Sequence, residues 1–297
     1  MLKGLMRNLI LLILFLSLAI AADDWTKNKK AIDVSIKKHE RALIKISDEI
    51  WHNAELALEE YKSSKILADY AEKNGFSLER GVAGMPTAFI ATYGSGRPRI
   101  GILGEFDANA GISQKAQSTK EALIEGAPGH GCGHNLYGTG SLGAAIAIKE
   151  LIAQGKIKGT IVFYGTPAEE TIFGKVWFAR AGLFNDLDVC MDWHPGDDME
   201  AATQSSKALI DFRVKFSGKA SHASADPWNG FSAVDAMELF TTGINYYREH
   251  IKPTARIHYQ IERAGDVVNV VPENAQIWVR VRENDRESLN VVYERVK

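Results

Sequence analysis

The sequence predicts an α/β protein in which a mostly parallel sheet flanked by helices is followed by a second, ferredoxin-like α+β domain. Between about residues 87 and 195, short apolar segments alternate with helical ones, a pattern typical of a parallel sheet covered by helices. From about residue 205 the pattern changes to alternating strands around a helix. The 297 residues, 45% of them hydrophobic, also exceed the ~250 at which single cores usually stop growing. We therefore expect two domains.

The first 22 residues differ from the rest of the chain. Lys3 and Arg7 precede an apolar run at 9–18, and Ala19-Ile20-Ala21 supplies the small residues that a signal peptidase needs. We expect a cleaved signal peptide over 1–22 and a secreted or periplasmic protein that does not remain on a membrane. A membrane anchor is the alternative, but the run is shorter than the ~20 residues that a span requires.

The first domain, 23–204, is expected to carry the sheet. Apolar positions such as Ile46 and Ile50 recur at helical spacing, and Gly75 follows a second helix as its left-handed cap. Apolar segments that turn acidic at one end read as buried parallel strands. We expect helices over 27–51, 60–74, 141–155 and 174–182, and strands over 87–94, 99–107, 159–170 and 187–195.

The second domain, 205–297, shows the order strand, helix, strand, strand, helix. We expect strands over 207–218, 255–263 and 275–284, a helix over 231–250, and the start of another helix from 286. This is a ferredoxin-like order without its last strand. We therefore expect the chain to stop inside its second domain.

The charge balance and the two cysteines bear on whether the protein binds nucleic acid and whether it contains a disulfide. Lys and Arg number 35 against 37 Asp and Glu, and no basic run is present, so nucleic acid is not an expected partner. Cys132 and Cys190 could form one disulfide in an exported protein. Because Cys190 lies in an apolar, strand-like segment where a buried thiol is ordinary, we expect no bridge.

The segment "PGHGCGHNLYG" (128–138) suggests a metal site. Glycines at 129, 131 and 133 would let the backbone fold tightly enough to point Cys132 and His134 inward. Further polar residues lie where strands are expected to end, and in such sheets ligands bind beyond the carboxyl ends of the strands. These residues are Asp107, Glu169, Glu170 and His194. Thiolate, imidazole and carboxylate donors together suit a divalent ion such as zinc.

The adjacent glutamates in "PAEE" (167–170) could have two different chemical roles. One carboxylate can coordinate metal while its neighbour takes a proton from a metal-activated water, so we expect hydrolysis of a carbonyl compound. A nucleophilic Cys132 is an alternative, but His134 is poorly placed as its base. A phosphate-binding loop is another, although neither common phosphate-loop motif is present.

Several motifs in order resemble the metallopeptidase-twenty family of amidohydrolases. They are "GHGCGHN", "GTPAEE", "WHP", "GKASHASADPWNGFSAVDA" and "NVVPENAQIWVRVR". The resemblance covers about residues 30–297 and is greatest to the branch of the B-type protein of aminobenzoyl-glutamate utilisation, which includes a β-alanyl-lysine dipeptidase type. It implies hydrolysis of the amide bond of aroyl or other N-acyl amino acids or of small dipeptides.

The resemblance also implies a catalytic domain that binds two divalent ions, Zn²⁺ or Mn²⁺, and an inserted lid domain that forms a homodimer. It makes Glu169 the general base and Asp107 a residue that orients a ligand histidine. The metal ligands implied in this way are Cys132, which would bridge the ions, His134, Glu170 and His194.

In the lid, the resemblance implies that His222 stabilises the oxyanion, often in the site of the dimer partner, and that Asn269 and Arg282 lie near the substrate. The family takes a final histidine ligand from beyond the lid, which this sequence does not reach. We therefore expect a C-terminally truncated chain that folds poorly and has little activity. A non-catalytic metal-binding or assembly protein that retains the fold is the alternative function.

Overall fold

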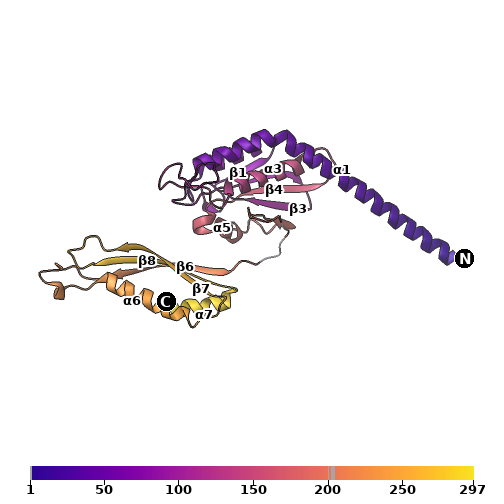
Figure 1. Cartoon of the computed structure of the whole chain (residues 1–297). Helices are drawn as coiled ribbons and strands as arrows, with labels where there is room; N and C mark the ends of the chain where they lie inside the picture. Colours follow the sequence, from indigo (N-terminus) through magenta and orange to yellow (C-terminus); the bar gives the residue numbers. More distant parts are fainter. Residues whose placement is uncertain (1, 200, 202–204) are drawn as a thin grey trace. The chain divides into compact units, whose positions relative to one another are not determined.

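The computed structural model describes residues 2–199, 201 and 205–297, with side chains from Trp25 onward. The chain divides into an N-terminal unit, Met1–Met199, and a C-terminal unit, Glu200–Lys297 (Figure 1). The predicted signal peptide, 1–22, lies outside the residues whose side chains are described. Among the helical residues that can be assessed, no stretch is both long and apolar enough to cross a membrane.

The N-terminal unit combines helices with a five-stranded sheet, which confirms the mixed α/β class. Its helices are α1 (Leu2–Asn53), α2 (Tyr61–Lys73), α3 (His134–Ala153), α4 (Glu169–Ile172) and α5 (Gly174–Arg180), with a 3₁₀ turn, η1, at Val82–Gly84. Its strands are β1 (Ser77–Arg80), β2 (Phe89–Ser95), β3 (Arg99–Gly104), β4 (Gly159–Gly165) and β5 (Val189–Met191), in the order β1-β2-β4-β3-β5.

The prediction of a mostly parallel sheet is confirmed only in part, because the sheet is mixed and β2 runs against the other strands. β3 runs parallel to β4 and β5, but β1 pairs antiparallel with β2, and β2 pairs antiparallel with β4. Only residues 96–98 separate β2 from β3. A parallel connection needs a dozen or more residues, so the chain reverses here.

Both faces of the sheet are buried at its centre, and strand periodicity divides the apolar residues there between the two faces. On β4, Ile161 and Phe163 join a core with Phe89 and helical residues such as Leu142, whereas Val162 and Tyr164 join a second core with Phe178. In Figure 1, α1 and α3 lie over one face and α5 lies on the other side of the sheet. All seven residues of β4 are buried, as expected of a central strand.

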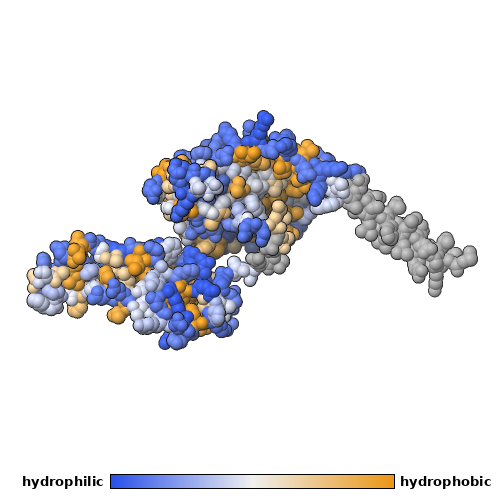
Figure 2. All heavy atoms as spheres, in the orientation of Figure 1, coloured by the Kyte–Doolittle hydropathy of each residue, from blue (hydrophilic) through white to orange (hydrophobic). Residues whose placement is uncertain are grey.

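The inner face of α1 is more polar than its sequence suggests. Ile46 and Ile50 are buried as expected, but Ile36 is exposed and His39 lies inside. His39 contacts the Tyr70 hydroxyl at 2.7 Å and Glu150 at 3.2 Å, linking α1 to α2 and α3. Figure 2 shows mainly hydrophilic side chains along the outer edge of this unit, where α1 lies.

Cys190 is exposed, contrary to the expectation of a buried thiol. It lies on β5, which pairs with β3 alone among the strands described and whose three residues are all exposed. The apolar sequence of this edge strand is typical of a central one, because hydrophobicity alone does not reveal what covers a strand. Cys132 and Cys190 are both free thiols in the structure.

The C-terminal unit has the predicted order of elements. It comprises β6 (Ala208–Ser217), a 3₁₀ turn, η2 (Pro227–Asn229), α6 (Ala233–Arg248), β7 (Arg256–Ala264), β8 (Asn274–Glu283) and α7 (Arg286–Val296). The antiparallel sheet has the order β6-β8-β7. Alternate residues of β8, including Ile277, Val279 and Val281, form a separate core with α6 and α7.

Candidate metal centre

The predicted site residues of the N-terminal unit follow the carboxyl ends of three parallel strands. Asp107 follows β3, Glu169 follows β4 and His194 follows β5. Because β4, β3 and β5 are neighbouring parallel strands, these ends meet at one edge of the sheet. The strands are shorter than predicted and end before the polar residues, which therefore lie in loops or at helix starts.

Glycines shape the loop that carries Cys132, as the sequence suggested. Gly133 precedes α3 with a φ of +72°, a conformation that most residues with a side chain avoid. At Gly129 an added Cβ would lie 2.5 Å from the carbonyl oxygen of Ile112, so a larger residue would collide with the backbone. These two positions allow the loop to end with His134 as the first residue of α3.

Helix α3 begins at His134, not at the predicted Ser141. The glycines between these positions suggested a loop. At Gly138, however, an added Cβ would lie 2.6 Å from the Glu105 carbonyl oxygen. The helix therefore needs a glycine to approach the end of β3 closely, and this approach brings His134 beside the acidic residues that follow the strand.

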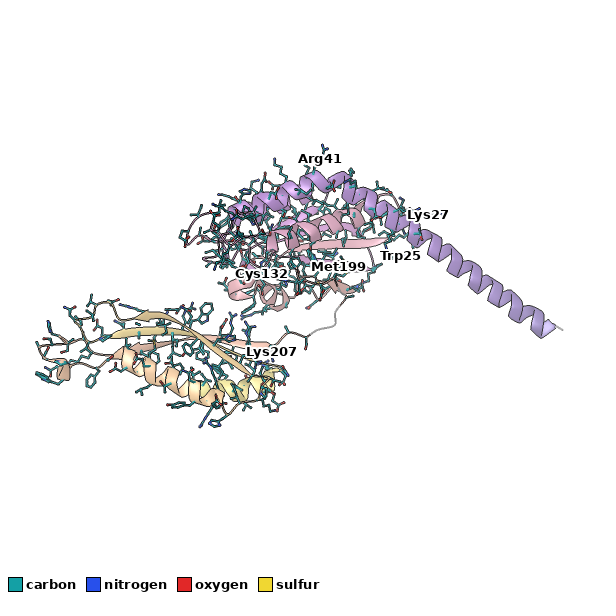
Figure 3. All side chains as sticks on the ribbon, in the orientation of Figure 1. Trp25, Lys27, Arg41, Cys132, Met199 and Lys207 are labelled. Atoms are coloured by element: carbon teal, nitrogen blue, oxygen red, sulfur yellow. The ribbon has the colours of Figure 1, made fainter. Side chains whose placement is uncertain are left out.

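Three predicted ligands meet at this edge. One ligand atom each from Cys132, His134 and His194 lies within 4.8 Å of the others. His134 is buried with 1% of its surface exposed, Cys132 is partly buried and His194 is exposed. Figure 3 labels Cys132, far from Arg41 on the outer face of α1. The structure thus joins residues from three separate segments in one cluster with metal-ligand chemistry.

Both histidines have oxygen acceptors at Nδ1, and His134 Nε2 faces the carboxylates of Glu105 and Glu170. His134 Nδ1 lies 3.0 Å from both the backbone oxygen and Oδ1 of Asp107, and His194 Nδ1 lies 2.9 Å from the Pro195 carbonyl oxygen. Oxygen acceptors at Nδ1 favour the tautomer in which Nε2 carries a lone pair, which is how ligand histidines are commonly held.

Glu105 is a site residue that the sequence reasoning missed. It is 1% exposed, its Oε2 lies 3.0 Å from His134 Nε2, and it forms a second possible ligand group with His134 and Glu169. Lys175 pairs with its other oxygen. The available signal was position: Glu105 lies two residues before Asp107, just after a buried strand, where alternate residues share a side.

Apart from the short ionic contacts of Glu105 with His134 and Lys175, several buried polar atoms at the site lack a hydrogen bond. They are His134 Nε2, Glu170 Oε1 and both carboxylate oxygens of Glu105. Glu170 Oε1 lies 4.0 Å from His134 Nε2. Buried polar atoms are nearly always satisfied, and exceptions often mark an absent ion. Together with the sulfur, nitrogen and oxygen donors, these atoms fit one or more divalent cations.

The electrostatics of the site reflect an excess of carboxylates. Burial alone would lower the pKa of His134, but Asp107 and Glu105 outweigh it and raise that pKa to about 10. Burial and the neighbouring Glu105 and Glu170 raise the pKa of Glu169. Burial, together with a hydrogen bond to Glu170, raises the pKa of the Cys132 thiol to about 12. The same negative charge would favour a bound cation.

The two adjacent glutamates are presented by a tight turn. Ala168 precedes α4 with φ +60°, although it has a side chain, and Phe173 ends α4 with φ +55°. Asp107 accepts a hydrogen bond from the Glu170 amide at 2.9 Å. Asp107 therefore contacts both His134 and the backbone of this turn.

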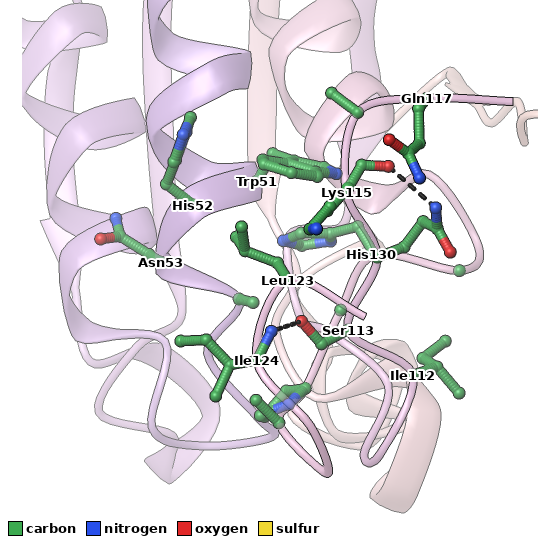
Figure 4. Close-up of a pocket in the computed structure, with 17 residues that line it drawn as sticks. Trp51, His52, Asn53, Ile112, Ser113, Lys115, Gln117, Leu123, Ile124 and His130 are labelled. Carbon is green, nitrogen blue, oxygen red and sulfur yellow. Dashed lines mark hydrogen bonds between the residues drawn. The ribbon is translucent and has the colours of Figure 1, made fainter. Parts of the chain in front are cut away.

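A cavity of about 360 Å³ lies beside the ligand loop (Figure 4). Its wall combines apolar side chains such as Trp51 and Ile112 with polar ones such as His52 and Lys115. Residues 129–131 also line it, but Cys132 and His134 do not. The cavity therefore borders the loop that leads to Cys132, but the predicted metal ligands do not line it.

The predicted lid residues lie at two places in the C-terminal unit. His222 bridges to Val270, which brings it beside Asn269, near the start of β8. Arg282 lies eight residues along β8 from Asn274, about 26 Å at ~3.3 Å per residue. The structure thus brings His222 and Asn269 together and leaves Arg282 apart from them.

The ring of His222 is oriented by the backbone. Its Nδ1 lies 3.3 Å and 3.2 Å from the amides of Ser224 and Ala225, which donate to it. An accepting Nδ1 leaves the proton of a neutral ring on Nε2. His222 therefore offers an N–H donor.

Comparisons with known proteins agree with this arrangement. The chain is 40% identical over 267 residues to the B-type component of p-aminobenzoyl-glutamate hydrolase of Escherichia coli, covering 89% of this chain and 56% of that protein. It is 32% identical over 268 residues to human Xaa-Arg dipeptidase, covering 83% and 56%. The chain thus spans little more than half the length of these relatives.

A solved structure shares the fold. The aminobenzoyl-glutamate utilization protein from Klebsiella pneumoniae aligns with a TM-score of 0.66 at 21% identity, covering 89% of this chain and 72% of that one. Residues 106–290 match the model of peptidase family M20/M25/M40. The resemblance noted in the sequence motifs is confirmed, and the chain belongs to peptidase family M20/M25/M40.

Proposed function

We propose that this chain belongs to a metal-dependent amidohydrolase that cleaves the amide bond of N-acyl or N-aroyl amino acids or of small dipeptides. The convergence of Cys132, His134 and His194 beside Glu169 is the observation that carries the proposal. The hydrolase and dipeptidase activities named for its relatives support it. A non-catalytic role is not favoured, because buried polar clusters without a function are costly to retain.

Two divalent ions, Zn²⁺ or Mn²⁺, are the proposed cofactors. Cys132, His134, Glu170 and His194 would hold them, with Asp107 orienting His134. A solved relative of this fold from Bacillus subtilis is described as a dinuclear metal-binding peptidase, which supports the choice of two. Bound there, the cations would polarise the amide carbonyl and lower the pKa of a water molecule toward neutrality.

Glu169 is the proposed general base. Its raised pKa suits a group that takes a proton from water and passes it to the leaving amine. His222 would donate Nε2–H to the developing oxyanion. We expect His222→Ala to lower kcat about 10²–10³-fold while metal content stays unchanged. Equal loss of metal and turnover would contradict this role.

The cavity beside Trp51 supports a substrate with both aromatic and polar parts. Its apolar wall would accept an aromatic ring, whereas His52, Asn53 and Gln114 offer polar contacts. An aroyl-glutamate, the substrate class named for the Escherichia coli relative, has this composition. Asn269 and Arg282 are proposed as further substrate contacts from the lid.

The two units of the chain are proposed to have different roles. The C-terminal unit, placed in the sequence at 205–297, would act as lid and homodimer interface, and residues 23–204 would form the catalytic domain. The proposed site of action is secreted or periplasmic, supported by Lys3, Arg7 and the apolar run after them. Neither nucleic acid nor, after signal cleavage, a membrane is a proposed partner.

The function is tested with purified protein in two measurements. Metal analysis should find about two equivalents of Zn²⁺ or Mn²⁺ per complete chain, and p-aminobenzoyl-glutamate or a dipeptide panel should be hydrolysed. Chelation should abolish turnover and added metal should restore it. Absence of both metal and turnover from a folded, full-length protein would overturn the proposal.

A further inference from the structure

Glu60 is a fully buried carboxylate outside the metal cluster. None of its surface is exposed, and its two oxygens accept from Thr87 Oγ1 and from the Ala168 amide, each at 2.8 Å. Both donors are neutral. Burying a carboxylate is costly even when it is hydrogen-bonded, so its presence here calls for a reason beyond stability.

Capping of the adjacent helix does not supply that reason. Glu60 occupies the N-cap position of α2, yet its side chain makes no capping hydrogen bond. The first amides of α2 are served instead by Glu55, which accepts from Lys62 N at 3.0 Å and from Ser63 N at 2.8 Å. The Glu60 side chain is therefore directed away from its own helix and toward the Ala168 turn.

The Ala168 turn is the segment that sets the positions of the two glutamates. Ala168 is fully buried, has φ +60° and directly precedes Glu169 and Glu170. A left-handed conformation at a residue with a side chain is strained and persists only when the surroundings fix it. The carboxylate of Glu60 is the acceptor for the amide of this residue.

The turn is thus held by a carboxylate at each end. Asp107 accepts from the Glu170 amide and Glu60 accepts from the Ala168 amide, with Glu169 between them. Glu60 is itself fixed by Thr87, whose carbonyl oxygen accepts from Ser64 Oγ at 2.7 Å. This arrangement connects α2 and the segment before β2 with the loop that follows β4.

We propose that Glu60 is a positioning residue, which holds the Ala168 turn so that Glu169 faces the reacting water and Glu170 faces the metal. The expected effect on catalysis rests on the proposed function, whereas the expected effect on the backbone of the Ala168 turn does not. The two effects are therefore tested by separate measurements.

The structural test is amide hydrogen exchange in the full chain. Glu60→Ala should speed exchange in residues 168–172 by more than tenfold, whereas Glu60→Gln, which keeps an oxygen for the Ala168 amide, should stay within threefold of wild type. Glu55→Ala is the matched control: it should speed exchange at the start of α2 and leave 168–172 unchanged. Unchanged exchange at 168–172 in Glu60→Ala would overturn the proposal.

The functional test compares Zn²⁺ affinity and steady-state kinetics. We expect Glu60→Ala to lower kcat about 10–100-fold with KM within threefold, and Zn²⁺ affinity to fall by up to the same factor. Glu60→Gln should keep both kcat and Zn²⁺ affinity close to the wild-type values. Loss of the same size in Glu55→Ala would show a general effect on folding and would contradict a specific role.

Two outcomes are kept apart by this design. If the wild type neither binds metal nor turns over substrate, the proposed function fails while the exchange data still decide whether Glu60 holds the turn. If Glu60→Ala does not fold, Thr87→Val replaces it, because it removes the hydroxyl that fixes Glu60. Faster exchange at 168–172 in Thr87→Val supports the proposal, and unchanged exchange contradicts it.

Discussion

At the scale of single residues, the carboxylates and imidazoles of the site differ in the kind of contact that their polar atoms make. Asp107 is satisfied by His134 and the Glu170 amide, whereas Glu105 makes only ionic contacts, with the Nε2 atom of His134 and with Lys175. This difference separates a group that orients others from groups that could face a cation. It gives two predictions.

The first concerns Glu169. Its conversion to Gln keeps the shape of the side chain but removes the proton acceptor, so kcat should fall about 10²–10⁴-fold while bound metal remains unchanged. Steady-state assays and metal analysis on the same preparation check this. Full turnover in the Gln variant would exclude Glu169 as the base.

The second concerns Glu105, whose carboxylate lies 3.0 Å from His134 Nε2. Glu105→Gln should weaken Zn²⁺ binding about 10–100-fold, because it removes a buried negative charge that supports the ligands. Competition with a chromophoric chelator measures the affinity. Asp192→Asn is the control, since Asp192 also lies near Lys175, at 3.5 Å, but is about half exposed. Equal affinities of the wild type and Glu105→Gln would refute the prediction.

At the scale of elements, buried contacts fix how the ends of helices and strands meet. The network of Glu60, Thr87 and Ala168 joins α2 with the loop after β4, and His39 joins α1 with α2 and α3. Such contacts couple the folding of one element to the ionisation of a group on another. The effect of Glu60 on stability is therefore testable through pH.

Burial raises the pKa of Glu60 from 4.5 to about 7. The folded protein holds this proton more tightly than the unfolded chain does. Glu60 therefore contributes on the order of 3 kcal/mol to the free energy of unfolding below pH 4.5, and this contribution is lost as pH rises to 7.

Urea denaturation of metal-free protein at several pH values should show this loss as a difference between wild type and Glu60→Gln. The wild type should lose stability relative to the variant between pH 4.5 and 7, because Gln cannot ionise. A constant difference across that range would mean that Glu60 titrates at an ordinary pKa.

At the scale of the whole molecule, each unit has its own core. Phe89 and Leu142 belong to the core shared by α1, α2, α3 and the five-stranded sheet, whereas Ile277 and Val281 belong to the core of the C-terminal unit. The ligand cluster lies entirely in the N-terminal unit. Units with separate cores can unfold separately.

Calorimetry with and without Zn²⁺ should therefore resolve two unfolding transitions. Zn²⁺ should raise the midpoint temperature of only one of them. At 100 times its Kd, a ligand stabilises the unit that binds it by about 2.7 kcal/mol. Cys132→Ser should reduce that shift and leave the other transition in place. A single transition that metal raises as a whole would show that the two units unfold together.

Local sequence patterns were sufficient to predict the α/β class, the order of elements in the C-terminal unit and the residue types of the site, but in the N-terminal unit they missed β1 and α4. Those features depend on local patterns: apolar periodicity locates helices and strands, and the glycines around Cys132 and His134 predict a tight loop. The placement of Asp107, Glu169 and His194 just beyond neighbouring strand ends follows from the same patterns, because parallel strands place their carboxyl ends together.

The strand pairing, the exposure of Cys190 and the roles open to Glu60 and Glu105 became evident in the folded protein alone. Strand order depends on contacts between distant segments, as where β4 inserts between β2 and β3. Residue type alone does not reveal whether a single glutamate at a helix start, such as Glu60, or after an apolar strand, such as Glu105, is fully buried. Its environment is set by the residues that fold around it, here Thr87 and Ala168 for Glu60, and His134 and Lys175 for Glu105.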